Sequence, residues 1–510
     1  MWKRNISVMS LDFFAPFLKS TPKPYIVESP PPPRIIQGPG LEKNDYDIKP
    51  YFIVASVEMG NTTTKCILTG VDLEKGVCYV INKTVRMSRD VRKPKPGEEI
   101  FGQTLDGTSL TRESVTELVS QTIITCHADA HLDIREDLDF VVRSTGVVAA
   151  MDSPDQVGDF VIALANGCLK AGVPPKKMTP PMSKANQAKK LQPFSFADRV
   201  NFSGAVAGVV PPKGATGVEM VANEMEGELA MAGIKEGAKW TPVDFRNPCI
   251  AIDFGTTLDG RITSDVAPDA TDPFANTIGN FCGLAGSILD GIVRGTGIVS
   301  EKTGTALDIF GDSTKKTVGI STRKKSRIVD EYVSRCHDVI SVEVVPSDRR
   351  RYGKVPVYAD IAKKSGVTLI GIDVGENGSQ MEQLEHIGRD IHENHSLDIL
   401  RTVIDKTGAD MALRLIDVTN ECGLISEKTS IGFTGRAAIS GSKPNYILKG
   451  LIERKLFNDP VNHLVFVDDG LARGAALMGR CMNSLGKPSM PIGGERGGKC
   501  IMSRRIAIGR

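Results

Sequence analysis

Two glycine- and threonine-rich segments carry the residues best suited to chemistry in this chain. The first runs from Glu58 to Lys65 and reads EMGNTTTK, and the second runs from Asp253 to Gly260 and reads DFGTTLDG. In each, an acidic residue ends an apolar run, a glycine follows two positions later, and threonines come next. Glycine permits a tight turn, and hydroxyl and amide groups donate to phosphate oxygens. The pair predicts two loops that wrap one phosphate chain, with Mg²⁺ held through waters by the acidic residues.

Two half-chains of similar organisation must position these loops. In the first, strand-like runs at 51–58, 65–70 and 77–86 are followed by a helix at 111–129, an apolar run at 140–142, a helix at 154–169, an apolar segment at 200–210 and a helix at 216–232. The second begins again with strands at 249–254 and 258–264, and further strand candidates follow at 367–373, 430–434 and 463–467. Three strands, then alternating helices and strands, is the order of the ribonuclease-H-like unit. We predict an α/β protein of two duplicated ribonuclease-H-like lobes with a nucleotide cleft between them.

The predicted boundaries follow changes in composition. They are an extended or disordered leader at 1–48, a first lobe at 49–247, a second lobe at 248–490 and a C-terminal tail at 491–510. The leader contains four consecutive prolines, which cannot supply a regular hydrogen-bonded ladder. Within the second lobe, the stretch at about 311–360 departs from the repeat, and we treat it as an insertion.

The predicted insertion is rich in basic residues. They include Lys315, Lys316, Arg323, Lys324, Lys325, Arg327, Arg349, Arg350 and Arg351. A solvated basic surface is the ordinary interpretation, and a docking patch for an acidic partner is the alternative.

The composition limits the class of protein. A chain of 510 residues is long enough for roughly two to four domains with cores of their own. The net charge of +2 gives no global attraction to nucleic acid or to an anionic membrane. Ten cysteines without a Cys-x-x-Cys pair favour reduced thiols and a cytoplasmic protein. The chain has no run of about 18 apolar residues, so we expect no membrane-spanning helix. Its first residues do not form a continuous apolar core before a small-residue cleavage site, so we expect no secretory signal.

The motifs resemble those of the superfamily of acetate and sugar kinases, Hsp70 and actin, whose nucleotide lies between two duplicated lobes. The superfamily's first phosphate pattern is matched by Glu58, Gly60, Thr62 and Lys65, its second by Asp253, Gly255, Thr256, Thr257 and Asp259, and its adenosine-side pattern by Gly432, Gly435 and Arg436. The segment 468–477 is similar to an interlobe helix of Hsp70-type proteins. The resemblance covers about residues 51–485. It implies that ATP and Mg²⁺ bind here, with Asn61 and Thr63 as further contacts.

More closely, the chain resembles the methanogenesis marker protein 14 family of methane-forming archaea. The segments that carry this resemblance are 57–65, 142–146, 223–230 and 252–261. The resemblance implies the same fold and a setting in methane-forming archaea.

The acidic and basic residues of the loops receive separate roles. Because Glu58 replaces the superfamily's usual aspartate and is one methylene longer, we expect water-mediated contact with Mg²⁺ there rather than base chemistry. Asp253 is the candidate for holding the metal or orienting the attacking nucleophile. Lys65 could neutralise phosphate during attack or could be only solvated. Asp259 could assist catalysis or could cap its turn.

Other residues could bind a metal or a cluster. His392 and His395, and likewise His127 and His131, have the spacing of one helical turn, but a polar helix face is the preferred interpretation. Cys282 could be a redox residue or a cluster ligand, or it could pack. An iron-sulfur cluster would need cysteines from a second subunit, because this chain has no ligand pair of its own.

We predict slow ATP hydrolysis that couples lobe closure to a protein partner, in the maturation or activation of a methanogenesis enzyme. A metabolite kinase of the same fold is the alternative, and it would need a polar pocket between the lobes. A non-catalytic nucleotide-sensing scaffold is a third interpretation. We expect no nucleic-acid or membrane partner, and the oligomeric state stays open, with a homodimer as one option.

Overall fold

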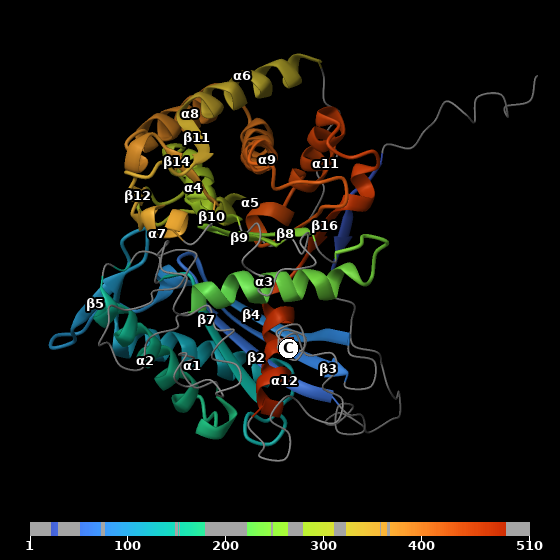
Figure 1. Ribbon diagram of the computed structural model, residues 1–510. Coiled ribbons are helices and arrows are strands. Elements are labelled where there is room, and N and C mark those ends of the chain that lie inside the picture. The colour runs from blue at the N-terminus through green and yellow to red at the C-terminus, as the bar shows by residue number, and fades with distance from the viewer. Residues whose placement is uncertain are drawn as a thin grey trace, which may run out of the picture.

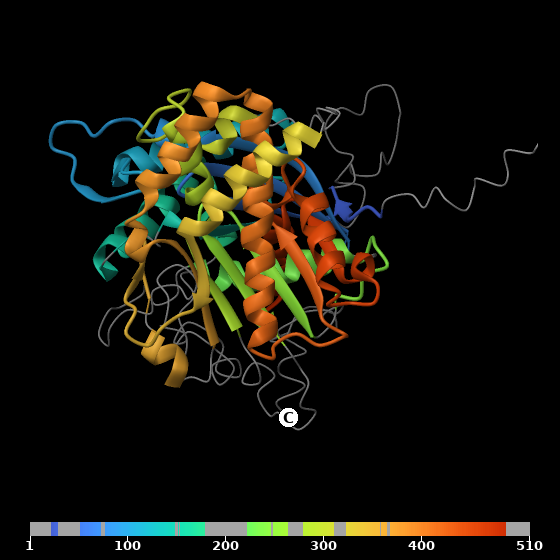
Figure 2. The same cartoon turned by 90° about the horizontal axis from the view of Figure 1, so that it is seen from above.

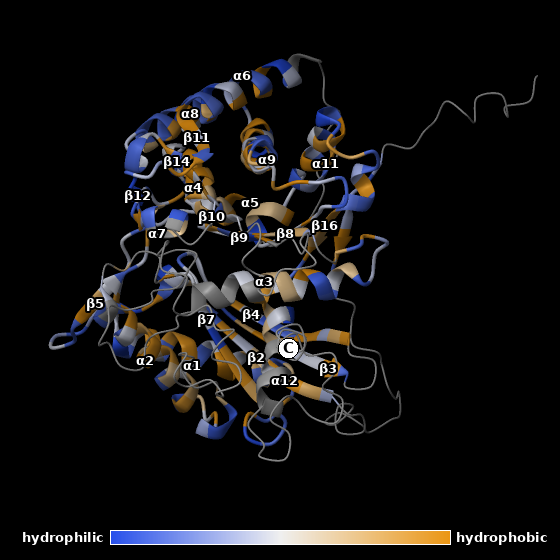
Figure 3. Ribbon diagram, in the orientation of Figure 1, coloured by the Kyte–Doolittle hydropathy of each residue, from blue (hydrophilic) through white to orange (hydrophobic). Residues whose placement is uncertain are grey.

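The computed structural model places the chain in two α/β lobes, one above the other in Figure 1. It describes residues 22–28, 51–72, 77–147, 151, 153–178, 222–245, 248–263, 279–310, 323–357, 359–364 and 368–485. Outside these ranges lie most of the expected leader, the apolar segment at 200–210, residues 216–221 of an expected helix, Lys315, Lys316 and the expected tail. Apolar residues dominate the strands that run through the interior of both lobes (Figure 3).

The first lobe is built on a four-stranded sheet in the order β4-β3-β2-β7. The strands are β2 (Tyr51–Met59), β3 (Thr63–Asp72), β4 (Val77–Met87) and β7 (Phe140–Thr145). The first three form an antiparallel meander, and β7 adds parallel to β2. Because successive side chains of a strand point to opposite faces, Ile53 and Val57 join one core and Phe52 and Val54 join another.

Helices α1 (Arg112–Asp129) and α2 (Pro154–Lys170) cover one face of this sheet. Both begin with a capping box, in which Thr111 pairs with Ser114 and Ser153 pairs with Gln156. Each pair satisfies backbone N–H groups that have no partner inside the helix. The helix starts expected from the sequence are therefore present.

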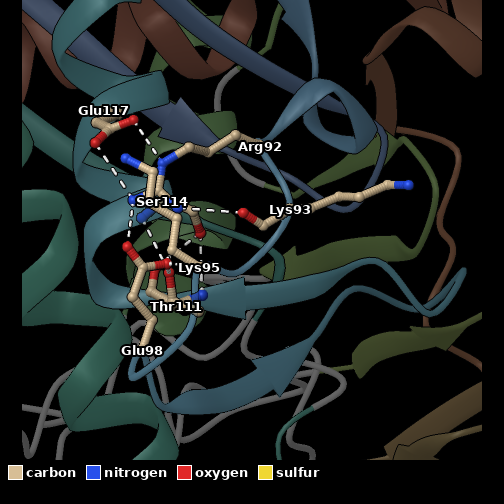
Figure 4. Close-up of polar contacts among 7 residues, drawn as sticks. All are labelled: Arg92, Lys93, Lys95, Glu98, Thr111, Ser114 and Glu117. Carbon is tan, nitrogen blue, oxygen red and sulfur yellow. Dashed lines mark hydrogen bonds and ion pairs between the residues drawn. The ribbon is translucent and has the colours of Figure 1, made fainter.

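An ion-pair network holds the segment between β4 and the hairpin of β5 (Ile100–Gln103) and β6 (Ser109–Thr111). Arg92 donates to both carboxylate oxygens of Glu98 at 2.6 and 2.7 Å, and to Glu117 of α1 at 2.7 Å (Figure 4). The Arg92 guanidinium holds the pKa of Glu98 at about 2, so the network stays charged at neutral pH. The network attaches this segment to α1. Arg89 in the segment and Leu105 in the turn between β5 and β6 both contact the second lobe.

The second lobe is built on an eight-stranded sheet in the order β1-β16-β15-β8-β9-β10-β14-β11. Its central strands are β8 (Cys249–Phe254), β9 (Leu258–Thr263), β10 (Gly279–Gly283), β15 (Ser430–Thr434) and β16 (Leu464–Val467). The order and directions of β10-β9-β8-β15 repeat those of β4-β3-β2-β7. This repetition confirms the predicted α/β fold of two duplicated lobes.

Helices cover the second sheet, as the view from above shows (Figure 2). They are α4 (Ala285–Gly295), α5 (Ala306–Phe310), α6 (Arg323–Val339), α7 (Ala359–Lys364), α8 (Met381–Asn394), α9 (Leu397–Glu421), α10 (Arg436–Ile439) and α11 (Lys443–Arg454). Ile250, Ile252 and Phe254 of β8 point into the core beneath these helices. This is the largest core of the described residues.

Two segments differ from a simple repeat. In the predicted insertion, β11 (Ile340–Val344) pairs with β14 (Thr368–Val374), which pairs with β10, so this region extends the sheet. The short hairpin of β12 (Arg351–Tyr352) and β13 (Val355–Pro356) lies between them in sequence.

The expected leader also contributes to the sheet, which corrects the prediction for three of its residues. Tyr25–Val27 form β1, parallel to β16. An aromatic and two β-branched residues favour a strand, and β16 would otherwise present an unpaired edge.

Two helices cross between the lobes, α3 (Ala222–Ala238) and α12 (Gly470–Leu485) (Figure 1). A Cβ at Gly474 would lie 1.8 Å from the backbone oxygen of Leu229, and one at Gly233 would lie 1.6 Å from the oxygen of Gly470. Only glycine permits this approach of two helix backbones. The segment expected to resemble an interlobe helix is therefore α12, and its small residues allow the crossing.

Candidate functional site

The two glycine-threonine loops meet between the lobes. The first joins β2 to β3 and the second joins β8 to β9. In each, the glycine N–H closes a tight turn, but the turns differ in length by one residue: Gly60 N–H donates to the Thr63 oxygen at 2.9 Å, and Gly255 N–H donates to the Thr257 oxygen at 3.1 Å. At the point of contact, the hydroxyls of Thr62 and Thr256 hydrogen-bond to each other. Loops distant in sequence therefore form one structure.

The predicted site residues converge on a single cleft. Those that line it are Glu58, Gly60, Asn61, Thr62, Thr63, Lys65, Asp253, Gly255, Thr256, Thr257, Asp259, Gly435 and Arg436. Its empty space is about 990 Å³, a figure that includes open solvent at its mouth.

Gly432 is the exception and corrects one prediction. It lies within β15, where an added Cβ would be 2.2 Å from Ile234 and 2.7 Å from Phe245. Alternation along the strand therefore directs this position toward α3, away from the cleft. Gly435, three residues later, does face the cleft with φ of 85°, and a Cβ there would lie 2.4 Å from Asp253 Oδ1.

Asn61 already has protein partners for its side chain. Its Oδ1 accepts from Leu105 N–H at 2.9 Å, and its Nδ2 donates to the Gly146 oxygen at 3.0 Å. Because the amide is engaged, this side chain positions the loop. The residue's own backbone remains the group that a ligand would contact.

Three carboxylates and one lysine occupy the cleft where the strands end. Lys65 Nζ lies 3.2 Å from Glu58 Oε2, because the two residues pair directly across β2 and β3. Burial would lower the pKa of Lys65, but Glu58 and Asp253 together raise it, so the ammonium stays charged. Burial and, secondarily, Glu58 raise the pKa of Asp253 to about 6, while Lys65 opposes the shift.

Asp259 is a buried carboxyl group next to Asp253. It pairs with Asp253 across β8 and β9 and is 5% exposed. Neither carboxylate oxygen has a hydrogen-bond partner among the described residues. Burial, followed by the charge of Asp253, raises its pKa well above the ordinary value. The Gly260 backbone and the charge of Arg261 oppose this shift. The two interpretations of Asp259, assistance in catalysis and a cap of its turn, both stay predictions.

A hydrated Mg²⁺ ion fits this set of donors. The described residues contain no group of three or more His, Cys, Asp or Glu side chains arranged to hold a metal directly. Mg²⁺ usually keeps several waters and takes one or two carboxylates together with phosphate oxygens. Glu58 and Asp253 would hold it in that manner. A cation here would also relieve the unfavourable burial of adjacent carboxylates.

The cleft also has apolar lining. Leu289, Leu307, Phe310 and Ala437 contribute to it, and Lys443 lines it as well. The Lys443 ammonium lies 5.1 Å from the centre of the Phe310 ring and 2.7 Å from Asp405 Oδ1. Apolar and charged side chains in one cleft match a ligand with a flat ring and a phosphate chain.

The walls supplied by α4, α5 and Lys443 were not predicted from the sequence. Asp290 of α4 lines the cleft, and together with Ser287 and Arg294 it follows the spacing of one helix face inside an otherwise apolar segment, which was the available signal. Their contribution depends on how α4 packs, which no local pattern specifies.

The alternative metal residues have structural roles. His392 is exposed on α8, and His395 lies beyond its end, edge-on to Tyr332. His127 is buried with Nδ1 2.8 Å from the Ile123 oxygen, whereas His131 lies past the end of α1 with φ of 55°, so these two do not share a helix face.

Cys282 is fully buried in β10, and burial raises the pKa of its thiol. Both facts support the packing interpretation of this cysteine.

One arginine of the basic stretch pairs with a buried carboxylate of the same chain. Arg349 is 14% exposed, pairs with the buried Asp373 at 2.6 Å and lies over the Tyr352 ring. This corrects its inclusion in a docking patch. Arg350 and Arg351 are exposed.

None of the described helices has the length and apolar character needed to cross a bilayer.

Comparison with solved structures finds distant likenesses. A reductive activator for a corrinoid, iron-sulfur protein is 10% identical, with 84% of this chain and 60% of that chain covered and a TM-score of 0.34. A hexokinase structure is 11% identical, with 84% of each chain covered and a TM-score of 0.28. The fold assignment rests on the strand order.

Comparison by sequence finds much nearer relatives. An uncharacterized protein of Methanocaldococcus jannaschii is 51% identical over 456 residues, covering 89% of this chain and 91% of the relative. One of Methanothermobacter thermautotrophicus is 50% identical over 463 residues, covering 90% and 84%. A family model described as "Uncharacterized protein conserved in archaea (DUF2114)" matches residues 51–509. The chain belongs to this archaeal family.

Proposed function

We propose that the protein binds ATP with Mg²⁺ in the cleft between its lobes and hydrolyses it slowly. The observation that carries this proposal is the direct contact of Thr62 with Thr256, which brings both loops onto one cavity. Loop amides and hydroxyls would donate to the phosphates, and the adenine ring would lie against the apolar side chains near Phe310.

The charged residues would divide the work of hydrolysis. Asp253 would orient the attacking water, and Lys65 would offset the negative charge that develops on the phosphoryl group. Glu58 and Asp253 would hold a hydrated Mg²⁺ ion, which supplies neutralisation of the phosphate charge. A bound cation would favour the ionised form of Asp259, which burial disfavours.

Hydrolysis would be coupled to movement of the lobes. Arg89 of the first lobe donates to both oxygens of Asp308 at 2.6 and 2.7 Å, and Lys354 of the second donates to the Leu105 oxygen at 3.0 Å. Since the proposed nucleotide contacts both lobes, loss of the γ-phosphate would change the stability of the closed form. A partner that recognises one form would sense the nucleotide.

We place this activity in the maturation or activation of a methanogenesis enzyme. The support is the resemblance to methanogenesis marker protein 14 together with membership of an archaeal family. Exposed Arg350 and Arg351 are the proposed contacts to an acidic partner. Charge reversal of both should weaken association at low salt and leave ATP affinity unchanged. Pull-downs from extract of a native host at several salt concentrations test this.

Calorimetry and phosphate release test the nucleotide proposal. Asp253→Ala should abolish turnover with the fold retained, whereas Asp155→Ala, an exposed aspartate on α2, should match the unchanged protein. If no purine nucleotide gives heat or a thermal shift, the proposal is wrong. Binding without turnover would favour the nucleotide-sensing scaffold.

A metabolite kinase is the second candidate. The observation that favours it is a second chamber next to the cleft, with both charged and apolar side chains in its walls, that shares Asn61, Thr62, Thr256 and Asp290 with it. Phosphate release that depends on an added metabolite would support this candidate over the ATPase.

A further inference from the structure

The chamber beside the nucleotide cleft has the features of a binding site in its own right. Its empty space is about 810 Å³, a figure that includes open solvent at its mouth. Its walls include α4, the turn between β5 and β6 with Asp106, the turn between β12 and β13 with Lys354, and the segment around Asn377. Both lobes therefore contribute, as in the cleft.

Helix α4 supplies a polar stripe to this chamber. Ser287, Asp290 and Arg294 all line it and lie on one face of the helix, while the neighbouring Ile288 and Ile292 are fully buried in the core. Asp290 is 6% exposed, and its Oδ1 accepts from Ala306 N–H at 2.7 Å. A charged side chain held at this depth suits a site that binds a polar ligand.

The chamber contains both basic and acidic side chains. Arg294 donates through Nε to the Gly304 oxygen at 2.7 Å, and no hydrogen bond involves its terminal nitrogens among the described residues. Lys354 is exposed and has two further ammonium hydrogens beyond its bond to Leu105. Asp106 and Asp290 are acceptors. Cations suit an acid group, and carboxylates suit hydroxyl groups that donate to them.

We propose that this chamber binds a small organic acid that carries hydroxyl groups. Arg294 and Lys354 receive the acid group, and Asp290, Asp106 and Ser287 receive the hydroxyls. The binding site stands independently of the nucleotide, but its role rests on the proposed function. Thr62 and Thr256 line both spaces, so a ligand hydroxyl lies beside the loops.

Two roles share this chemistry. As an acceptor, the ligand hydroxyl oxygen would bond to the γ-phosphorus of ATP while the bond to the β–γ bridging oxygen breaks. ADP would leave, and the hydroxyl proton would pass to Asp290. As a regulator, the ligand would bridge the lobes without reacting and would change the rate of hydrolysis.

Saturation-transfer NMR tests the site with D-gluconate and D-glycerate as acid probes and with sorbitol and glycerol as neutral counterparts. The acids should give signals with nucleotide-free protein, and the neutral polyols should give weaker ones. Arg294→Gln and Lys354→Gln should each reduce the acid signals at least fivefold. Lys302→Gln, an exposed lysine that does not line the chamber, should leave them unchanged.

Further variants guard against loss of folding. Arg294→Lys should restore part of the signal lost in Arg294→Gln, and Ser287→Ala removes a single hydroxyl with little change in packing. Thermal melts accompany each variant. Absence of any acid signal, or signals equal in the unchanged protein and in both charge variants, would overturn the proposal.

The same probes then distinguish the two roles in the presence of ATP and Mg²⁺. A phosphorylated probe detected by mass spectrometry identifies an acceptor, and a changed rate of phosphate release without that product identifies a regulator. Because binding is first measured without nucleotide, failure of ATP to bind would overturn the proposed function and leave this inference standing.

Discussion

The hydroxyls of Thr62 and Thr256 hydrogen-bond to each other across the lobe boundary, although the residues lie 194 positions apart. Each belongs to a tight turn that a glycine N–H closes after the first strand of its repeat, so the contact joins the corresponding loops of the two lobes. The two loops therefore touch each other where both line the proposed nucleotide site.

Thr256→Val should weaken ATP binding about tenfold, or ~1.4 kcal/mol, because one hydroxyl donor and the contact to Thr62 are lost together. Calorimetry measures the affinity. Thr402→Val on α9, whose hydroxyl bonds only to the Asp398 oxygen, is the matched control and should bind normally. Equal affinity in Thr256→Val and the unchanged protein would remove this hydroxyl from the site.

Asp253→Asn should stabilise the nucleotide-free protein above pH 6. The folded-state pKa of Asp253 is about 6, against an ordinary 3.8, so the folded protein carries the charged form at a cost. That cost is absent below pH 3.8, grows as pH rises, and is complete above pH 6, where it reaches up to about 3 kcal/mol. Urea unfolding of both proteins between pH 4 and 8 measures it.

The pH dependence provides the control for this prediction. The gain of the variant should shrink toward zero near pH 4, and a gain equal at all pH values would contradict the assigned cause. Millimolar Mg²⁺ should reduce the gain at pH 8, because the cation would stabilise the carboxylate in the unchanged protein.

Arg89→Ala should speed ADP release roughly fivefold, or about 1 kcal/mol, because the paired side chains are 24% exposed and join the lobes. Asp308→Ala should have a similar effect, and the double variant should add little to either one. Stopped-flow measurement with a fluorescent ADP analogue reports the rate. Arg112→Ala breaks a pair with Asp159 inside the first lobe and should leave release unchanged. If the effects of Arg89→Ala and Asp308→Ala add up in the double variant, the two residues do not act as a pair.

Gly474→Ala should destabilise the fold by about 3 kcal/mol, because its Cβ would lie 1.8 Å from the Leu229 oxygen at the crossing of α3 and α12. Gly227→Ala is the matched control, since the nearest atom to a Cβ there is Asp259 Oδ1 at 3.8 Å. Alanine's helix propensity should make that variant neutral or more stable by up to about 1 kcal/mol. Chemical unfolding compares the two, and equal losses would show that the helix crossing does not limit residue size.

Local patterns were enough to predict the strands and the loops of the site. The runs ending at Glu58 and Asp253 are apolar and β-branched, and each is followed by glycine and threonine, so both strand ends and turns were recognisable. The repetition of that pattern indicated duplication. The three strands β2, β3 and β4 and their counterparts β8 and β9 lie where the sequence places them.

Other features depend on contacts between distant segments. Gly432 faces α3, which lies about 200 positions earlier in the chain. The partner of Arg349 is Asp373, a carboxylate 24 positions away at a strand end. The pairing of β1 with β16 required an open sheet edge that no short window can reveal.

The sequence by itself determined the two loops, the duplicated fold and the charged groups at the strand ends, because each depends on neighbours within a few residues. Only the tertiary structure decided that Asp259 is buried beside Asp253, that Arg89 joins the lobes, and that α4 turns Ser287, Asp290 and Arg294 toward a second chamber. Burial and charge pairing are set by the packing of helices and strands from both halves, and the free energy of each group follows from those surroundings.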